Sequence, residues 1–225
     1  MARVAPSGRE STDIRTKTIL LFSALIAYGS GFWPNSLVLK YGGKALGYPP
    51  YEGFVGAFLP HLLLYSTLPA LVCALLWWLL SRNRLMMRMP LGNFRASLPI
   101  GIAAGLVSLL LLLALAWATM PAGTIHWIDP QPWKIAGNVF SNFFEEFIFR
   151  GFILVALMAV IGFWPAAVVS SVMWAAMHTQ YPLEFQAFIA LSGVLWAWAG
   201  RRVRSLWAPY TAHMTLDVIA DCLIG

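Results

Sequence analysis

Long apolar stretches alternate with short polar segments along the whole of this sequence. Each stretch is long enough for a helix, and most approach the roughly 20 residues that a helix needs to cross a bilayer. The apolar stretches cover about residues 18–39, 54–80, 98–119, 135–160, 165–178, 183–200 and 206–225. The pattern therefore predicts an all-α fold, in the form of a polytopic membrane bundle of about seven transmembrane helices.

The polar segments between these stretches have the composition of membrane-surface loops. Residues 81–95 contain several arginines interleaved with leucine and methionine, which suits a segment lying on a membrane surface. The loop at residues 121–134 carries Trp127 and Trp133, and we expect this loop at the level of the lipid headgroups. The sequence shows no internal repeat and no boundary between separate soluble domains.

Composition and charge support a membrane protein and predict its orientation. The chain of 225 residues is 60% hydrophobic and 11% charged, whereas a soluble domain carries about 25% charged residues. Of its 15 lysines and arginines, eleven fall in segments on the side of the N-terminus and three in segments on the opposite side. Because basic loops stay on the cytoplasmic side, the N-terminus is expected in the cytoplasm. The net charge of +6 then reflects topology and contact with membrane lipids, and no nucleic-acid partner is expected.

Three charged residues interrupt the fourth apolar stretch, at Glu145, Glu146 and Arg150. Each charge near the centre of a bilayer costs about 2.5–3.5 kcal/mol, so such residues face a polar interior, form pairs or take part in function. On a helix, Glu146 and Arg150 are separated by four residues and can form an ion pair. Glu145 lies about 100° further round the helix and is left as a spare carboxylate.

Two further polar pairs fall on other predicted helices. Trp174 and His178 are spaced by four residues near the end of the fifth stretch, and His213 and Asp217 have the same spacing in the seventh. Each pair alone has a structural explanation, as an interfacial histidine or as a helix–helix contact. Taken together, a carboxylate and two histidines inside a bundle form a set that can activate water.

Two chemistries remain open for this set. Glu145 can act as a general base on a water molecule, with the histidines orienting the water or stabilising an oxyanion. Alternatively, Glu145, His178 and His213 can bind Zn²⁺ or another divalent metal, since two histidines and a carboxylate are a known zinc set. The sequence contains no HExxH segment, the usual local signature of such a zinc site.

Three motifs resemble those of the CPBP (Abi, or CAAX-type) intramembrane proteases: EExxxR at Glu145–Arg150, an aromatic residue four positions before His178, and HxxxD at His213–Asp217. The resemblance covers about residues 134–225. It implies that Glu145 activates the attacking water, that His178 and His213 assist, and that Asp217 completes the site. Glu146, Arg150 and Trp174 occupy the supporting motif positions. Trp174 stands where the family usually has phenylalanine, and Asp217 is one of the two residues usual at its position.

On this basis we expect an intramembrane endopeptidase that hydrolyses peptide bonds of membrane-associated or lipidated protein substrates. Residues 134–225 would form the catalytic core of about four helices, and residues 1–133 a cytosolic tail with about three further spans. No cofactor is expected, with a divalent metal as the alternative. The protein would be multi-pass in the bacterial inner (cell) membrane, with its site between the fourth, fifth and seventh spans. A non-catalytic immunity or scaffolding protein and a proton-coupled transporter are the competing functions.

Overall fold

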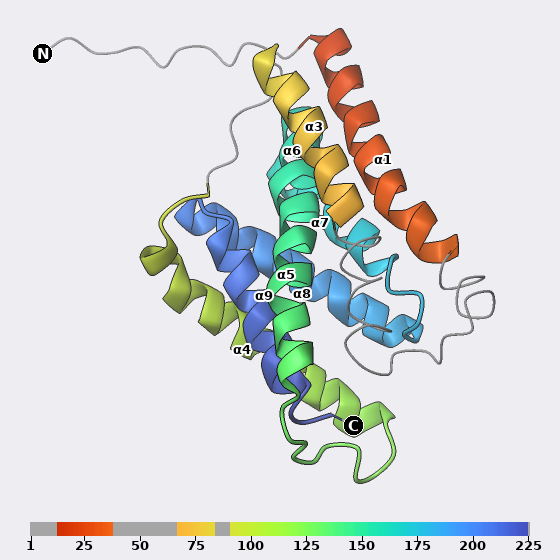
Figure 1. The fold of residues 1–225 in the computed structure, drawn as a ribbon, viewed down its shortest axis with the longest axis vertical. Coiled ribbons are helices and arrows are strands. Elements are labelled where there is room, and N and C mark those ends of the chain that lie inside the picture. Colours follow the sequence, from red (N-terminus) through yellow and green to blue (C-terminus); the bar gives the residue numbers. More distant parts are fainter. Residues whose placement is uncertain (1–12, 38–66, 84–90, 225) are drawn as a thin grey trace, which may run out of the picture.

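The computed structural model describes residues 13–37, 67–83 and 91–224 of the chain, and these ranges are built from helices (Figure 1). The described part contains no strand beyond an isolated bridge between Ile125 and Ile224. The helices are α1 (Ile14–Leu37), α3 (Leu68–Arg82), α4 (Phe94–Thr119), α5 (Pro132–Glu146), α6 (Leu154–Ile161), α7 (Phe163–Ala175), α8 (Leu183–Val203) and α9 (Trp207–Ala220), with a π-helix, η4 (Phe147–Ile153), between α5 and α6.

These bounds agree with the predicted stretches wherever the structure describes the chain. The first part of the second stretch, residues 54–66, lies outside the described residues. Local signals mark several helix ends: the Asn93 side chain caps α4 by accepting a hydrogen bond from the Ala96 amide, and Pro132 opens α5. Gly162 separates α6 from α7 with a φ of +79°, a conformation that glycine adopts without strain.

The fourth apolar stretch becomes a composite helix, because η4 connects α5 to α6 without a break in the helical backbone. This composite runs through the middle of the molecule (Figure 1). On one side α1 and α3 pack against each other and contact η4, and α1 also contacts α6. On the other side α4, α8 and α9 pack together. Single π-helical turns within α-helices occur often at functional sites, and this one carries Arg150.

Helix α9 is held close to α4 by small residues. A β-carbon added at Gly101 would come within 2.6 Å of the Ala208 carbonyl oxygen, and one at Gly105 within 2.6 Å of the Ala212 carbonyl oxygen. The two glycines are four residues apart and lie on one face of α4, which is the small-xxx-small pattern of closely packed membrane helices. This packing fixes the position of α9 and of the polar residues that it carries.

Many of the outward-facing side chains are large and apolar, among them Leu71, Leu110, Trp117 and Leu191. By length and composition, α4 and α8 are able to cross a membrane, and α3 and α7 are shorter apolar helices. The all-α class is therefore confirmed for the described residues. The number of spans and the cytoplasmic N-terminus stay predictions.

Candidate active site

The three motifs come together where the end of α5, η4, the end of α7 and the middle of α9 meet. The two adjacent glutamates end α5 but have different environments: Glu146 is fully buried, whereas Glu145 is partly exposed. This difference follows from helix geometry, since successive residues point about 100° apart. The two carboxylates therefore take part in separate sets of contacts.

Glu146 lies at the centre of a buried chain of charges. Its Oε1 accepts a hydrogen bond from Arg150 Nη1 at 3.1 Å and lies 3.0 Å from His213 Nδ1. The ion pair predicted from the four-residue spacing of Glu146 and Arg150 is thus present. The other ring nitrogen of His213, Nε2, lies 3.3 Å from Asp217 Oδ2. Each ring nitrogen faces a carboxylate oxygen, so an imidazole protonated on both nitrogens satisfies both contacts.

Arg150 is enclosed by aromatic rings as well as by its ion pair. Its guanidinium lies 4.1 Å from the ring centroid of Trp174 and 5.6 Å from that of Trp196. Nε and Nη2 of Arg150 and Oε2 of Glu146 are buried and have no hydrogen-bond partner among the described residues. A charged group so deeply buried is retained only with a compensating charge close by, and Glu146 provides it.

Glu145 is held by a neutral donor instead of a cation. The indole Nε1 of Trp174 donates a hydrogen bond to Glu145 Oε2 at 2.7 Å. The second carboxylate oxygen, Oε1, receives no hydrogen bond from the residues that the structure describes. A phenylalanine at position 174 would fill similar space but could not donate this bond. The carboxylate of Glu145 is therefore fixed through one oxygen, while the other is left for a water or a substrate.

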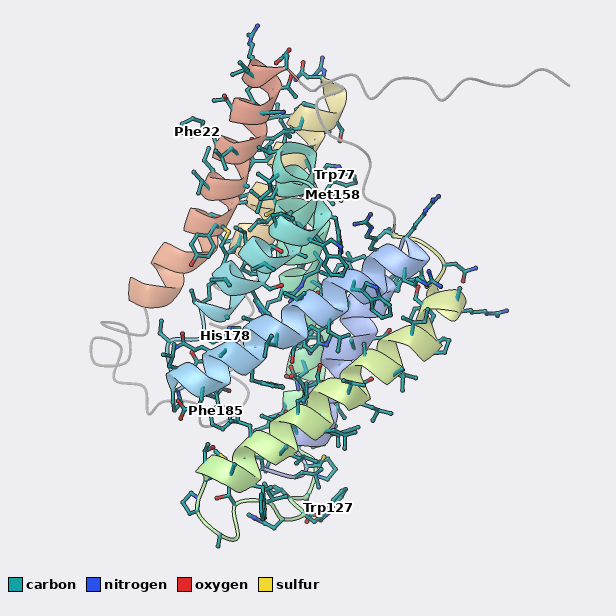
Figure 2. All side chains as sticks on the ribbon, turned by 180° about the vertical axis from the view of Figure 1, so that it is seen from behind. Phe22, Trp77, Trp127, Met158, His178 and Phe185 are labelled. Carbon is teal, nitrogen blue, oxygen red and sulfur yellow. The ribbon has the colours of Figure 1, made fainter. Side chains whose placement is uncertain are left out.

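His178 lies just beyond α7, beside the start of α8, which carries Phe185 (Figure 2). Its Nδ1 is 3.0 Å from the carbonyl oxygen of Trp174. A carbonyl oxygen can only accept, so Nδ1 carries the proton and a neutral ring presents Nε2 as an acceptor. His178 is partly exposed, and the ring of Tyr181 stacks on it with centroids 6.2 Å apart.

The indole of Trp174 is in contact with both histidines. Its ring centroid is 5.3 Å from that of His178 and 5.2 Å from that of His213. Both nitrogens of His213 face Glu146 and Asp217, so neither points to a position shared with Glu145 and His178. Within the described ranges no three His, Cys, Asp or Glu side chains are grouped as a metal site. The residues of the alternative zinc set do not fit a shared ion in this arrangement.

Two asparagines on α5, which the sequence analysis did not single out, extend the contact between the polar residues of α5 and those of α9. Asn142 Nδ2 donates to Asp217 Oδ2 at 2.9 Å, and one turn earlier Asn138 Nδ2 donates to Asp221 Oδ2 at 3.0 Å. The spacing contained a signal for them. Positions 138, 142, 146 and 150 share one face of a helix, and positions 213, 217 and 221 share a face of α9.

One comparison with known proteins identifies a family for this region. Residues 129–219 match the family model described as type II CAAX prenyl endopeptidase Rce1-like. The matched segment begins just before α5, ends within α9 and contains all three motifs. The resemblance to the CPBP and CAAX-type proteases is thereby confirmed. None of the curated proteins and none of the solved structures matches the chain.

Proposed function

We propose that this chain, whose residues 129–219 form a Rce1-like domain, is an intramembrane endopeptidase that uses a water activated by Glu145. Its substrates would be membrane-associated or lipidated proteins. The observation that carries this proposal is the environment of Glu145. Its carboxylate is partly exposed, Trp174 fixes one of its oxygens, and the other is unoccupied by the described residues.

In the proposed reaction, Glu145 removes a proton from a water molecule, and the resulting hydroxide attacks the carbonyl carbon of the scissile bond. The bond between this carbon and the nitrogen then breaks, and the proton held by Glu145 passes to the leaving amine. Nε2 of His178 is available to orient the water or to relay that proton. The ring of His213 packs against Trp174 and lies between Glu146 and Asp217, with one ring nitrogen facing each carboxylate.

The membrane setting is part of the proposal. We infer a multi-pass protein of the bacterial inner membrane with a cytoplasmic N-terminus and about seven spans. Two observations support the membrane location itself: the apolar, outward-facing side chains of the helices, and the length and composition of α4 and α8. The partly exposed members of the site lie at the end of α5 (Glu145), just beyond α7 (His178) and on α9 (Asp217), and the substrate would reach Glu145 between these elements.

The decisive experiment compares the wild-type chain with Glu145→Gln in proteoliposomes, with an internally quenched farnesylated peptide that ends in a CAAX sequence as the substrate. A general base contributes about 10²–10⁴-fold to a rate, so we expect cleavage to fall by at least about 100-fold. The amide keeps the shape of the side chain, so the melting temperature in detergent should stay close to that of the wild type. Full activity of Glu145→Gln would contradict the proposed role.

A comparison of protein N- and C-termini in membranes with and without the active chain would identify natural substrates. New termini that depend on Glu145 would support an endopeptidase. Their complete absence, together with no cleavage of the peptide, would favour a scaffolding protein or a transporter.

A further inference from the structure

We infer that Asn142 is a positioning residue that holds the Asp217 carboxylate against His213. This inference rests on the proposed hydrolase, because the site that it serves is the one described above. Asn142 is almost fully buried, with 2% of its surface exposed, and lies on α5, one turn before Glu146. Its Nδ2 donates to Asp217 Oδ2 at 2.9 Å.

The oxygen that Asn142 contacts is the same one that faces the histidine. Asp217 Oδ2 is 2.9 Å from Asn142 Nδ2 and 3.3 Å from His213 Nε2. The side chain of Asp217 is 30% exposed, so water competes for its oxygens and other rotamers are open to it. The hydrogen bond from α5 favours the one rotamer in which Oδ2 stays next to the imidazole.

The amide of Asn142 is itself oriented. Asn142 Oδ1 lies 3.3 Å from the Ser141 hydroxyl, which shares its one proton with the Gly137 carbonyl oxygen at 3.0 Å, and Asn142 Nδ2 lies 3.6 Å from Met214 Sδ. A carboxylate of Asp217 can only accept, so the NH₂ group is the half of the amide that must face it. The donor direction from Asn142 to Asp217 therefore follows from chemistry as well as from position.

The resulting chain of contacts crosses between α5–η4 and α9. It begins at Asn142 and continues through Asp217, His213 and Glu146 to Arg150. His213 is held on its Nδ1 side by buried Glu146, but on its Nε2 side by a partly exposed carboxylate. Asn142 compensates for that weaker side, because it ties Asp217 to the buried face of α5.

The chain offers a matched control for this role. Asn138 on the preceding turn of α5 makes the same amide–carboxylate contact with α9, through Asp221 at 3.0 Å. That contact links the same two helices but is one turn removed from the histidine. Replacing either asparagine weakens the α5–α9 contact, whereas only Asn142 contacts the carboxylate that faces His213.

The test uses the full chain in detergent, with Asn142→Ala and Asn138→Ala compared in two measurements. The first is kcat and KM for the quenched farnesylated CAAX peptide. We expect Asn142→Ala to lower kcat on the order of tenfold with KM unchanged, because it disturbs a group that supports the site. Asn138→Ala should keep the wild-type kcat, even where both variants lose similar thermal stability.

The second measurement is independent of activity: the ring nitrogen resonances of His213 in protein labelled with ¹⁵N-histidine, assigned by their loss in His213→Gln. Asn142→Ala should shift the Nε2 resonance, and Asn138→Ala should not. If the wild-type chain fails to cleave the peptide, the proposed function is in doubt, yet this resonance still decides whether Asn142 positions Asp217. Identical His213 spectra for the two variants and the wild type would overturn the inference.

A double-mutant cycle tests the contact itself. Asn142→Ala and Asp217→Ala each remove the pair, and Asp217→Ala also removes the carboxylate that faces His213. We expect the combined variant to lose no more kcat than Asp217→Ala alone, since residues in direct contact are not additive. Additive effects of the two substitutions on kcat would count against direct positioning.

Discussion

The buried and the partly exposed halves of the site use similar side chains for opposite purposes. In the buried half, Arg150, Glu146 and His213 neutralise one another at distances of 3.0 to 3.1 Å with almost no access to solvent. In the partly exposed half, Glu145 is fixed by the neutral indole of Trp174, and no cation is paired with it among the described residues. Adjacent glutamates of one helix thus differ in the partner that each receives.

Two adjacent glutamates of one short motif therefore have different roles: Glu146 holds helices together, and Glu145 is placed for the proposed reaction. Glu146 is fully buried, with a guanidinium and an imidazole on its Oε1, so a substrate cannot reach it from solvent. Glu145 is partly exposed and is held by a single indole N–H, so its second oxygen can contact a water molecule. The buried half therefore provides rigidity, and the partly exposed half is suited to the proposed reaction.

The largest effect should come from breaking the buried half at Arg150. Arg150→Ala leaves Glu146 buried without its guanidinium, a change that typically costs about 3–5 kcal/mol. We expect the melting temperature in detergent to fall on the order of 10 °C. Arg202, an exposed arginine on α8, is the matched control, and Arg202→Ala should melt near the wild type. Equal melting of Arg150→Ala and Glu145→Gln would show that the two halves do not differ as described.

A smaller effect is expected from the partly exposed half at Trp174. Trp174→Phe keeps an aromatic ring but removes the hydrogen bond to Glu145, and a bond to a charged acceptor is worth about 1.5–3 kcal/mol. Cleavage of the quenched peptide should fall by about tenfold or more, with a modest change in melting temperature. The measurement is kcat of purified protein in proteoliposomes.

Trp196 provides the control for that variant. Its indole also lies against His213, with ring centroids 4.8 Å apart, but its N–H donates to Ser108 on α4. Trp196→Phe should therefore affect stability more than kcat. A loss of kcat in Trp196→Phe as large as in Trp174→Phe would mean that bulk and packing near the histidines matter, and not the bond to Glu145.

Much of this arrangement could be predicted from local sequence patterns. The helices follow the apolar stretches, because the length and hydrophobicity of each stretch are properties of the segment alone. The ion pair between Glu146 and Arg150 also followed from spacing, since the two residues lie on one helix. The resemblance to CAAX-type proteases rested on motifs at fixed separations, and the family model matches the same region.

Contacts between helices could not be predicted in the same way. That His213 contacts Glu146 instead of Glu145 depends on the rotation of α9 relative to α5, and the close packing of α4 on α9 sets this rotation. The role of Trp174 was equally hidden, because a large aromatic residue predicts filled space and not a donor aimed at Glu145. The spacing places Asn142 on the helix face of Glu146 and Arg150, but it does not identify Asp217 as its partner, since an asparagine in a helix has many possible partners.

The smallest effect should come from removing metal ions, and it tests whether the partly exposed half works through Glu145 without a metal. Both nitrogens of His213 are engaged with carboxylates, and Nδ1 of His178 is engaged with a backbone carbonyl. A shared metal would require His213 to leave Glu146 or Asp217 and so to disrupt the buried half. We therefore expect that dialysis against a chelator leaves peptide cleavage and melting temperature unchanged, and that metal analysis of the active protein finds no stoichiometric zinc. If chelation abolishes cleavage and added zinc restores it, the two halves of the site must rearrange around an ion. The different roles assigned to Glu145 and Glu146 would then be wrong.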